Sequence, residues 1–260
     1  MSPPVDPELL DFAVQITREA GAFTLEMFHQ AELDIERKGD GSPVTAADKG
    51  AERLLRERIE AAFPEDAILG EEEAPKQGTS GRRWVIDPID GTESFTHGVA
   101  LYTNLLYLED EHGPAVGVIN VPAIGELVAA GRGLGAWFNG TRCHVNDHDR
   151  LDGALLSASG FDWWPPEMLS QVHSSGLAMR TWGDGYGYLL VATGRIEAMV
   201  DPAANFWDIA PCQVVIDEAG GRWSALDGTA DAHAGNFVAT NGHIHDAILD
   251  VLAEPLRDVP

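Results

Sequence analysis

The chain has 260 residues, of which 44% are hydrophobic and 23% charged, so it is long enough for one large domain or two packed domains with the composition of an ordinary globular protein. Its formal net charge is −25, because 42 acidic residues outnumber 17 lysines and arginines. This charge argues against nucleic acid or an anionic membrane surface as a partner, since either would be repelled.

The two cysteines and the N-terminal segment give expectations about location. Cys143 and Cys212 lie far apart and form no C-x-x-C pair, so we expect reduced, buried thiols and no disulfide. The segment MSPPVDPELLDF lacks the basic stretch and apolar stretch of a secretory signal. No apolar run approaches the roughly 20 residues that span a bilayer. We therefore expect a cytoplasmic protein.

Two helices are predicted near the N-terminus. Apolar residues from Leu9 to Met27 recur at alternating spacings of four and three, which is one face of an amphipathic helix. The next segment, IERKGDGSPVTAAD, is rich in glycine, proline and charge and predicts a loop. Thr45 and Asp48 mark the start of a second helix, which we expect to end at Phe63 and Pro64.

The remaining chain predicts a change of architecture near residue 150. From Ala67 to about Val145, short β-rich runs such as LYTNLLYL and AVGVINV predict strands, and the Asn-Gly of WFNGTRCHV predicts a hairpin. After Leu151, predicted strands ALLSAS and IEAMV alternate with predicted helices YGYLLVATG, WDIAPCQVVIDEAGG and HIHDAILDVLA. We expect an α+β or α/β protein, with a helix-flanked antiparallel sheet in residues 1–150 and an α/β part in residues 151–260.

The segment WVIDPIDGTESF concentrates the chemistry. Asp87 and Asp90 stand close together in a turn, where like charges repel unless a proton or a cation lies between them. Pro88 stiffens this turn, Gly91 lets the backbone approach a ligand, and the free N–H groups of a helix starting at Thr92 could hold a phosphate. Mg²⁺ takes oxygen ligands from a few carboxylates, and the sequence therefore predicts a magnesium and phosphate site.

Two further acidic positions are ambiguous by themselves. Glu71 belongs to an acidic triplet, which is usually a solvated loop. Asp208 stands at the start of a predicted helix, where an aspartate is usually a cap.

Taken together, the acidic motifs resemble those of the inositol monophosphatase family. The matching segments are GEE, WVIDPIDGT, and WDIA followed by EAGG, and PVTAAD and VATG extend the resemblance over nearly the whole chain. The resemblance implies a layered α-β-α-β-α sandwich and a homodimer. It also implies a lithium-sensitive phosphomonoesterase that uses two or three Mg²⁺ ions on a small-molecule phosphate ester.

The resemblance also assigns roles to residues. Glu71, Asp87 and the carbonyl of Ile89 would hold one metal, and Asp87, Asp90 and Asp208 would hold a second. Glu71 could also reach a third ion, and Lys38 matches a lysine near it. Asp90, Gly91 and Thr92 would bind phosphate. Together with Glu71 as a catalytic residue, the pair of Asp48 and Thr92 would orient the attacking water.

Specificity is expected to come from the second half. The segments RTWGDGYGY, from Arg180 to Tyr188, and VDPAANFWD, from Val200 to Asp208, resemble the histidinol-phosphate phosphatase branch of the family. Gly185 is a departure, because that branch often has cysteine there. We expect substrate contacts from Asp184, Asp201, Arg180 and Asn205. The alternatives are a helix cap for Asp184 and a strand-end turn for Asp201.

Three functions stay open at this point. The first is hydrolysis of L-histidinol phosphate in histidine biosynthesis, by attack of a metal-activated water. The second is hydrolysis of inositol 1-phosphate or other small sugar phosphates. The third is a catalytically silent, metal-binding homologue, which the presence of every acidic motif residue and of Thr92 disfavours.

Overall fold

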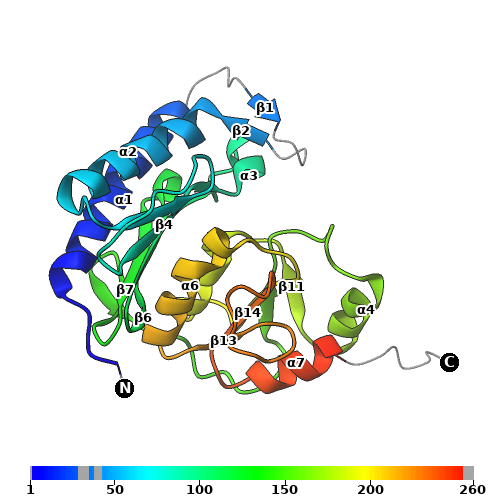
Figure 1. Ribbon diagram of the computed structural model, residues 1–260. Helices are drawn as coiled ribbons and strands as arrows, with labels where there is room; N and C mark the ends of the chain where they lie inside the picture. The colour runs from blue at the N-terminus through cyan, green and yellow to red at the C-terminus, as the bar shows by residue number, and fades with distance from the viewer. Residues whose placement is uncertain (1, 29–34, 38–42, 254–260) are drawn as a thin grey trace.

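The computed structural model describes residues 2–28, 35–37 and 43–253, in which layers of helices and layers of sheet alternate (Figure 1). Helices α1 (Pro7–Phe28) and α2 (Ala46–Ala62) cover one face of a seven-stranded sheet. Helices α5 (Gly185–Ala192) and α6 (Phe206–Glu218) lie between this sheet and a five-stranded sheet. Helices α4 (Pro166–Ser174) and α7 (His245–Ala253) cover the far side. The expected α-β-α-β-α sandwich is confirmed.

The seven-stranded sheet follows chain order. Its strands are β3 (Ala67–Gly70), β4 (Arg83–Asp90), β5 (Thr103–Asp110), β6 (Gly113–Val121), β7 (Glu126–Gly131), β8 (Gly135–Phe138) and β9 (Thr141–Cys143). Strands β3 and β4 are parallel, and all other neighbours are antiparallel. Asn139 and Gly140 have φ angles of 46° and 79° between β8 and β9, so the predicted Asn-Gly hairpin is confirmed.

The five-stranded sheet is mixed. Its spatial order is β11-β10-β12-β14-β13, with strands β10 (Leu155–Ser157), β11 (Ala178–Arg180), β12 (Ala198–Asp201), β13 (Arg222–Ser224) and β14 (Phe237–Thr240). Strand β10 runs parallel to both its neighbours, and β14 is antiparallel to both of its own. Both faces are covered by helices, and the central strands β12 and β14 are buried along their whole length.

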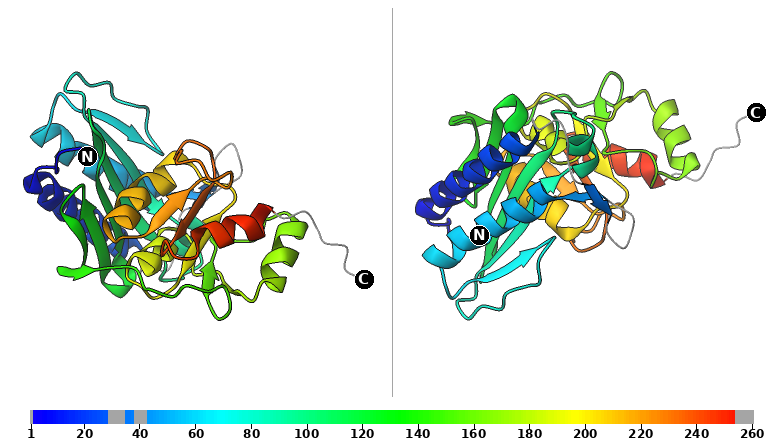
Figure 2. Two further views of the ribbon diagram at one scale, coloured as in Figure 1. Left: turned by 90° about the horizontal axis from the view of Figure 1, so that it is seen from below. Right: turned by 90° about the horizontal axis from the view of Figure 1, so that it is seen from above.

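The two N-terminal helices form as expected, side by side on the sheet (Figure 2). Ala13, Ile16 and Ala20 of α1 are buried, as the apolar stripe predicts. Thr45 caps α2 by accepting the N–H of Ala47. The predicted loop before α2 is wrong in part, because β1 (Ile35–Arg37) pairs antiparallel with β2 (Pro43–Thr45). Lys38 lies outside the described residues.

Helix α6 occupies the centre of the molecule and sets the spacing between the sheets. Buried residues of α6 such as Ile209 and Val215 share one hydrophobic cluster with Val85 of β4 and Phe237 of β14. A Cβ atom on Gly117 of β6 would lie 2.2 Å from the carbonyl oxygen of Pro211 in α6, so glycine is what lets the helix sit this close. This contact helps to set the distance between α6 and the sheet.

The same cluster joins the two halves of the chain. The seven-stranded sheet belongs to residues 1–150 and the five-stranded sheet to residues 151–260, and both contribute buried residues around α6. We propose these two ranges as structural parts that fold onto a common core. None of the helices in the described ranges has the length and apolar character that crossing a bilayer demands.

We predict that Gly117→Ala displaces α6. The added methyl meets backbone, which cannot rotate away, so we expect a loss of about 1–3 kcal/mol of stability and roughly ten-fold weaker binding of Mg²⁺ at the expected carboxylate site. Thermal unfolding and calorimetric titration with Mg²⁺ measure the two effects.

Val118→Ala is the matched control. Val118 is buried on the opposite face of the same strand, against α1 and α2. We expect a similar loss of stability, about 2 kcal/mol, with unchanged Mg²⁺ affinity. Equal Mg²⁺ affinities for the two variants would contradict the role given to Gly117.

Candidate active site

Three carboxylates from two elements meet at the end of β4. Oxygen atoms of Asp87, Asp90 and Asp208 all lie within 4.8 Å of one another. Asp87 shares a strand face with Val85, two residues earlier, and that face packs on α6. Asp208 is the third residue of α6. The close packing of α6 on the sheet therefore places Asp208 beside the two aspartates of β4.

A bulge in β4 turns Asp90 to the same side as Asp87. In a regular strand, residues three apart point to opposite faces. Asp87 pairs with Leu105 but Asp90 pairs with Thr103, so β4 has one residue more than β5 at this point. Pro88 lies in the bulge, where it has no N–H to leave unpaired, and its carbonyl accepts the side-chain amide of Asn104 at 2.7 Å.

Asp90 is fixed by two donors. Its Oδ2 accepts the hydroxyl of Thr103 at 2.8 Å and the backbone N–H of Gly185 at the start of α5. A Cβ on residue 185 would lie 2.5 Å from the Thr103 hydroxyl oxygen. Gly185, a departure from the pattern of the branch, therefore lets α5 approach Asp90 closely.

The cluster is buried and has unused capacity to bind a cation. Asp87 is 2% exposed, Asp90 is 9% exposed, and Oδ1 of Asp87 has no hydrogen-bond partner among the described residues. A buried carboxylate oxygen without a partner is costly, and a cation placed there would remove that cost. The all-oxygen donor set suits a hard divalent cation such as Mg²⁺.

The electrostatics of the cluster agree with this. Burial, and then the charges of Glu71, Asp90 and Asp208, hold the pKa of Asp87 well above its usual range. Burial raises the pKa of Asp90 to about 7, and burial with the neighbouring Asp90 raises that of Asp208 to about 8. The protein on its own thus favours protons on these groups, for which a divalent cation would compete.

Glu71 reaches the cluster from β3 and does not lie in a freely solvated loop. Its negative charge raises the pKa of Asp87, Asp90 and Asp208. The loop that follows is held by Glu52 of α2, a fully buried carboxylate that accepts the N–H groups of Glu72 at 2.7 Å and Glu73 at 3.1 Å. Glu52 was not predicted, because its partners lie 20 residues further along the chain.

The turn after Asp90 has the expected shape for a phosphate. Gly91 has a φ of 80°, a left-handed conformation that favours glycine, and the short helix α3 (Thr92–Thr96) begins directly after it. The Thr92 hydroxyl lies 2.9 Å from the carbonyl oxygen of Ile89 and 3.3 Å from Oδ1 of Asp48. The Thr92 hydroxyl and the Asp48 carboxylate are thus neighbours, as the resemblance implies.

Asp48 and Asp208 also cap their helices. The second oxygen of Asp48 accepts the N–H of Thr45 at 2.8 Å and its hydroxyl at 2.6 Å, and burial raises the Asp48 pKa. Asp208 accepts the N–H of Asn205 at 2.7 Å. Asp208 is therefore a helix cap, as the simple interpretation predicts, and the same carboxylate also belongs to the cluster. Asn205 itself is the residue before the helix.

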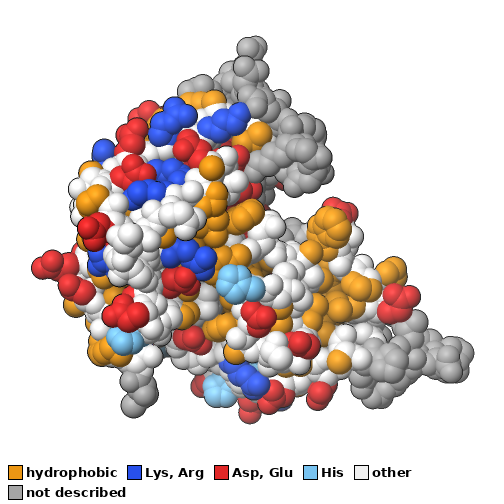
Figure 3. Space-filling model, in the orientation of Figure 1, with side chains coloured by type: hydrophobic (Ala, Val, Ile, Leu, Met, Phe, Trp, Pro, Cys, Tyr) orange, Lys and Arg blue, Asp and Glu red, His pale blue; other side chains and the backbone are white. Residues whose placement is uncertain are grey.

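A cavity of about 320 Å³ opens next to the cluster. It lies between α3 and the loop that follows β10, in the hollow that Figure 3 shows between the part with α1 and α2 and the part with β11 and α4. Its lining comes from both halves of the chain: Glu71, Gly91, Thr92, Glu93, Ser94, Ser159, Gly160, Asp162, Trp163 and Asp184. A small phosphate ester on the Gly91 turn would extend into it.

Asp184 lines this cavity from the start of α5. It occupies the cap position, but its side chain makes no cap hydrogen bond. Its backbone has a φ of 56° and a ψ of −155°, a region costly for residues other than glycine, by about 1–3 kcal/mol. Its carboxylate is so close to the phosphate turn that a Cβ on Gly91 would lie 2.5 Å from Oδ2 of Asp184. Burial, then Asp90 and Asp201, hold its pKa well above the usual range.

Asp201 lies deeper than Asp184, and both of its oxygens have partners. Oδ1 accepts the N–H of Ser159 at 3.0 Å and Oδ2 accepts the hydroxyl of Tyr188 at 2.7 Å. The side chain is 6% exposed at the end of β12. These contacts support the cavity wall. Arg180 is exposed, with its guanidinium 2.6 Å from the carbonyl of Met179 and over the ring of Trp182.

Sequence reasoning did not find Ser159, Gly160 and Trp163 as cavity residues. They follow β10, and only the packing of this loop against the start of α5 brings them to the Gly91 turn. The single signal in the sequence was the Trp163-Trp164 pair.

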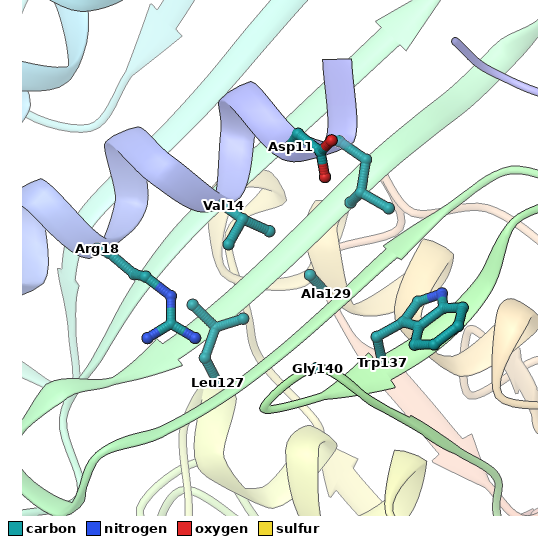
Figure 4. Close-up of a pocket in the computed structure, with 8 residues that line it drawn as sticks. Asp11, Val14, Arg18, Leu127, Ala129, Trp137 and Gly140 are labelled. Carbon is teal, nitrogen blue, oxygen red and sulfur yellow. The ribbon is translucent and has the colours of Figure 1, made fainter. Parts of the chain in front are cut away.

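A second hollow lies on the opposite side of the molecule, between α1 and the strands β7 and β8 (Figure 4). Val14, Leu127 and Ala129 make its floor apolar, and Asp11 and Arg18 stand on α1 at its side. It holds neither a group of carboxylates nor a positive-φ turn beside a helix start, so its chemistry differs from that of the cavity at Gly91.

The stability of the metal-free protein should fall as pH rises, and Mg²⁺ should oppose this fall. Asp90 and Asp208 have raised pKa values when folded, so between about pH 5 and about pH 8 the unfolded chain is deprotonated there while the folded chain still holds protons. The metal-free protein should thus lose stability as pH rises, by several degrees in melting temperature. Mg²⁺, which needs the ionised carboxylates, should raise the melting temperature more at about pH 8 than at about pH 5.

Asp208→Asn is the control for this prediction. It removes one titrating carboxylate, so both the pH slope and the Mg²⁺ increment should shrink. A metal-free melting temperature that rises over this pH range, or an increment independent of pH, would contradict the assignment.

Comparison with known proteins agrees with this geometry. The model of the inositol monophosphatase family matches residues 6–258. The histidinol-phosphatase of Chlorobaculum parvum is 40% identical over 243 residues, covering 89% of this chain and 94% of its own, and that of Mycobacterium tuberculosis is 36% identical over 249 residues, covering 92% and 96%. The solved structure of the extragenic suppressor protein suhB from Bartonella henselae superposes with a TM-score of 0.89 at 28% identity, covering 96% of this chain and all of that one. This chain belongs to the inositol monophosphatase family.

Proposed function

We propose that the protein is a Mg²⁺-dependent phosphomonoesterase whose substrate is L-histidinol phosphate, which it hydrolyses to L-histidinol and phosphate in histidine biosynthesis. The observation that carries the reaction class is the buried Oδ1 of Asp87, which has no hydrogen-bond partner within the described part of the chain and lies in a carboxylate cluster that adjoins the Gly91 turn. The observation that carries the substrate is the carboxylate of Asp184 in the cavity wall beside that turn.

The residues that would hold the cations are those that the structure brings together. Glu71, Asp87, Asp90 and Asp208 offer carboxylates, and Ile89 offers its carbonyl at the bulge, which suffices for two or three ions with water completing their shells. Bound Mg²⁺ would supply a Lewis acid that activates water and stabilises the charge that develops on the phosphate oxygens. Displacement of one such ion by lithium would inhibit the enzyme.

Thr92 and Asp48 would orient the attacking water. The Thr92 hydroxyl has a single proton, and the nearby Asp48 carboxylate can accept it. The hydroxyl oxygen is then free to accept a hydrogen bond from water, which orients that water toward the phosphorus. Asp48 is fixed for this task by Thr45, and its complete burial keeps bulk water away from the pair.

The phosphate would rest on the turn after Asp90. The backbone of Gly91, which has no Cβ, lets the anion approach, and the first N–H groups of α3 point to it. Six carboxylates lie around this place, those of Asp48, Glu71, Asp87, Asp90, Asp184 and Asp208, so the phosphate would bind only with the cations. This explains why a strongly acidic protein can accept an anionic substrate.

The rest of the substrate would meet Asp184. L-histidinol phosphate carries an ammonium group near its phosphate, and a partly buried carboxylate is a strong partner for it, because charge-assisted hydrogen bonds are stronger than neutral ones. The sequence similarity of this chain to the histidinol-phosphatases named above also supports this substrate. Asp201 would act through Ser159 by holding the cavity wall in place, and Arg180 and Asn205 stay predictions as substrate contacts.

Inositol 1-phosphate is the second candidate, because membership of the family covers it equally well. An inositol ring presents only hydroxyl groups, so it has no cationic group to pair with the partly buried carboxylate of Asp184. We also propose a homodimer, which the family resemblance implies, and a cytoplasmic location, which the free cysteines Cys143 and Cys212 support.

Removal of a cluster charge should abolish turnover. We expect Asp90→Asn and Asp208→Asn each to lower kcat for histidinol phosphate with Mg²⁺ by about a thousand-fold, because each removes a charge that holds the cations. A chelator should have the same effect on the native protein. Phosphate release measures the rates. Asp217 lies on the exposed side of α6, so Asp217→Asn should keep kcat within about two-fold of the native value. Activity that survives in chelator would refute the reaction class.

The substrate assignment predicts a selective loss. Asp184→Asn should lower kcat/KM for histidinol phosphate at least about ten-fold more than for a simple aryl phosphate, because only the former has an amine for the carboxylate. Asp201→Asn should lower both equally, because its oxygens bond to Ser159 and Tyr188. Native preference for inositol 1-phosphate in the same assay would favour the second candidate.

A further inference from the structure

Two adjacent tryptophans in the loop after β10 have opposite surroundings. Trp164 is 4% exposed and packs into the hydrophobic cluster of β10, β12, α4 and α7. Trp163 lines the cavity beside the Gly91 turn and is 75% exposed, the highest exposure among the large hydrophobic residues that the structure shows as exposed within its described ranges. A large apolar side chain exposed at a cavity mouth offers a large apolar surface that a bound ligand would remove from water.

The backbone on both sides of Trp163 is fixed. At one end, the N–H of Ser159 donates to Asp201 at 3.0 Å, and the Ser159 hydroxyl accepts the N–H of Asp184 at 2.9 Å. At the other end, the N–H of Trp164 donates to the carbonyl of Phe161 at 3.1 Å, and the side chain of Trp164 packs in the core cluster. Trp163 therefore projects from a tethered loop, and its place at the cavity is set by the fold.

The loop also touches the segment that begins α5. A Cβ on Gly183 would lie 2.2 Å from the Cα of Ser159, so the two backbones are in direct contact. Asp184, which follows Gly183, and Trp163 thus line one cavity from two segments that are packed together. The cavity has an anionic wall at Asp184, a phosphate turn at Gly91 and Thr92, and an aromatic surface at Trp163.

We propose that Trp163 is a specificity-determining residue whose indole packs against a planar heteroaromatic ring on the substrate. This inference rests on the proposed function, in which the phosphate lies on the Gly91 turn and an amine meets Asp184. In histidinol phosphate a short aliphatic chain carries the amine and ends in an imidazole, which would extend past Asp184 toward the cavity mouth.

The physical basis is the match between the two rings. An imidazole and an indole stack with favourable dispersion, and a protonated imidazole adds a cation–π attraction to the indole face. A ring-free ester would leave Trp163 in water and gain nothing from it. The contact forms with the substrate away from the reacting phosphate, so it should act on KM more than on kcat.

The experiment compares Trp163→Ala and Trp163→Phe with the native protein, in Mg²⁺, on histidinol phosphate and on glycerol 3-phosphate, which has no ring. We expect Trp163→Ala to lower kcat/KM for histidinol phosphate about ten-fold, chiefly through KM, and to leave glycerol 3-phosphate within about two-fold. Trp163→Phe should restore most of the loss. Trp137→Ala is the control, because Trp137 is an exposed tryptophan of the separate hollow in Figure 4.

A second measurement needs no turnover. With Mg²⁺ present, the products L-histidinol and inorganic phosphate together should change the tryptophan fluorescence of the native protein, and the change should be lost in Trp163→Phe but kept in Trp137→Ala. An equal loss of kcat/KM on both esters, or no loss on either, would overturn the role of Trp163 while the proposed function stands. A native enzyme that hydrolyses glycerol 3-phosphate but not histidinol phosphate would overturn the proposed substrate and this inference together.

Discussion

The repulsion among buried carboxylates is the constraint on which the rest of the structure depends. Asp87, Asp90 and Asp208 lie within one small volume, with Glu71 and Asp184 beside them, and burial makes their ionised forms unfavourable. A fold driven by local preference alone would separate these groups. The packing of α6 between two sheets, supported by a large apolar cluster, holds them together. The site is thus unfavourable by itself, and a bound cation would relieve the repulsion.

Glycine provides much of the precision of this arrangement. Gly117 allows the backbone of α6 to approach β6, Gly185 allows α5 to approach Asp90, and Gly91 allows Asp184 to approach the phosphate turn. In each case a methyl group would lie 2.5 Å or less from a neighbouring atom. The glycines therefore position the elements of the site: Gly117 brings two backbones together, and Gly185 and Gly91 bring a backbone against the side chains of Thr103 and Asp184.

The two halves of the chain divide the chemistry between them. The first half contributes Glu71, Asp87, Asp90 and the Gly91 turn, and the second half contributes Asp208 from α6. The cavity wall of Ser159, Trp163 and Asp184 comes from the second half and is held by Asp201 below it. This division allows the reaction to stay the same while the wall, and with it the substrate, changes between relatives of one fold.

By itself the sequence predicted every helix except α4, the strands β5, β6, β10 and β12, the β8–β9 hairpin and the reaction class, because amphipathic spacing, turn residues and the D-P-x-D-G-T pattern are local signals. It also pointed to Glu71, Asp48 and Asp208, through their resemblance to a family. Only the tertiary structure decided that β1 and β2 pair within a segment predicted as a loop, that Asp201 has both oxygens occupied, and that Glu52 and Trp163 support and line the site. These depend on contacts between residues far apart in the chain, where neither spacing nor propensity carries information, and packing alone selects the partner.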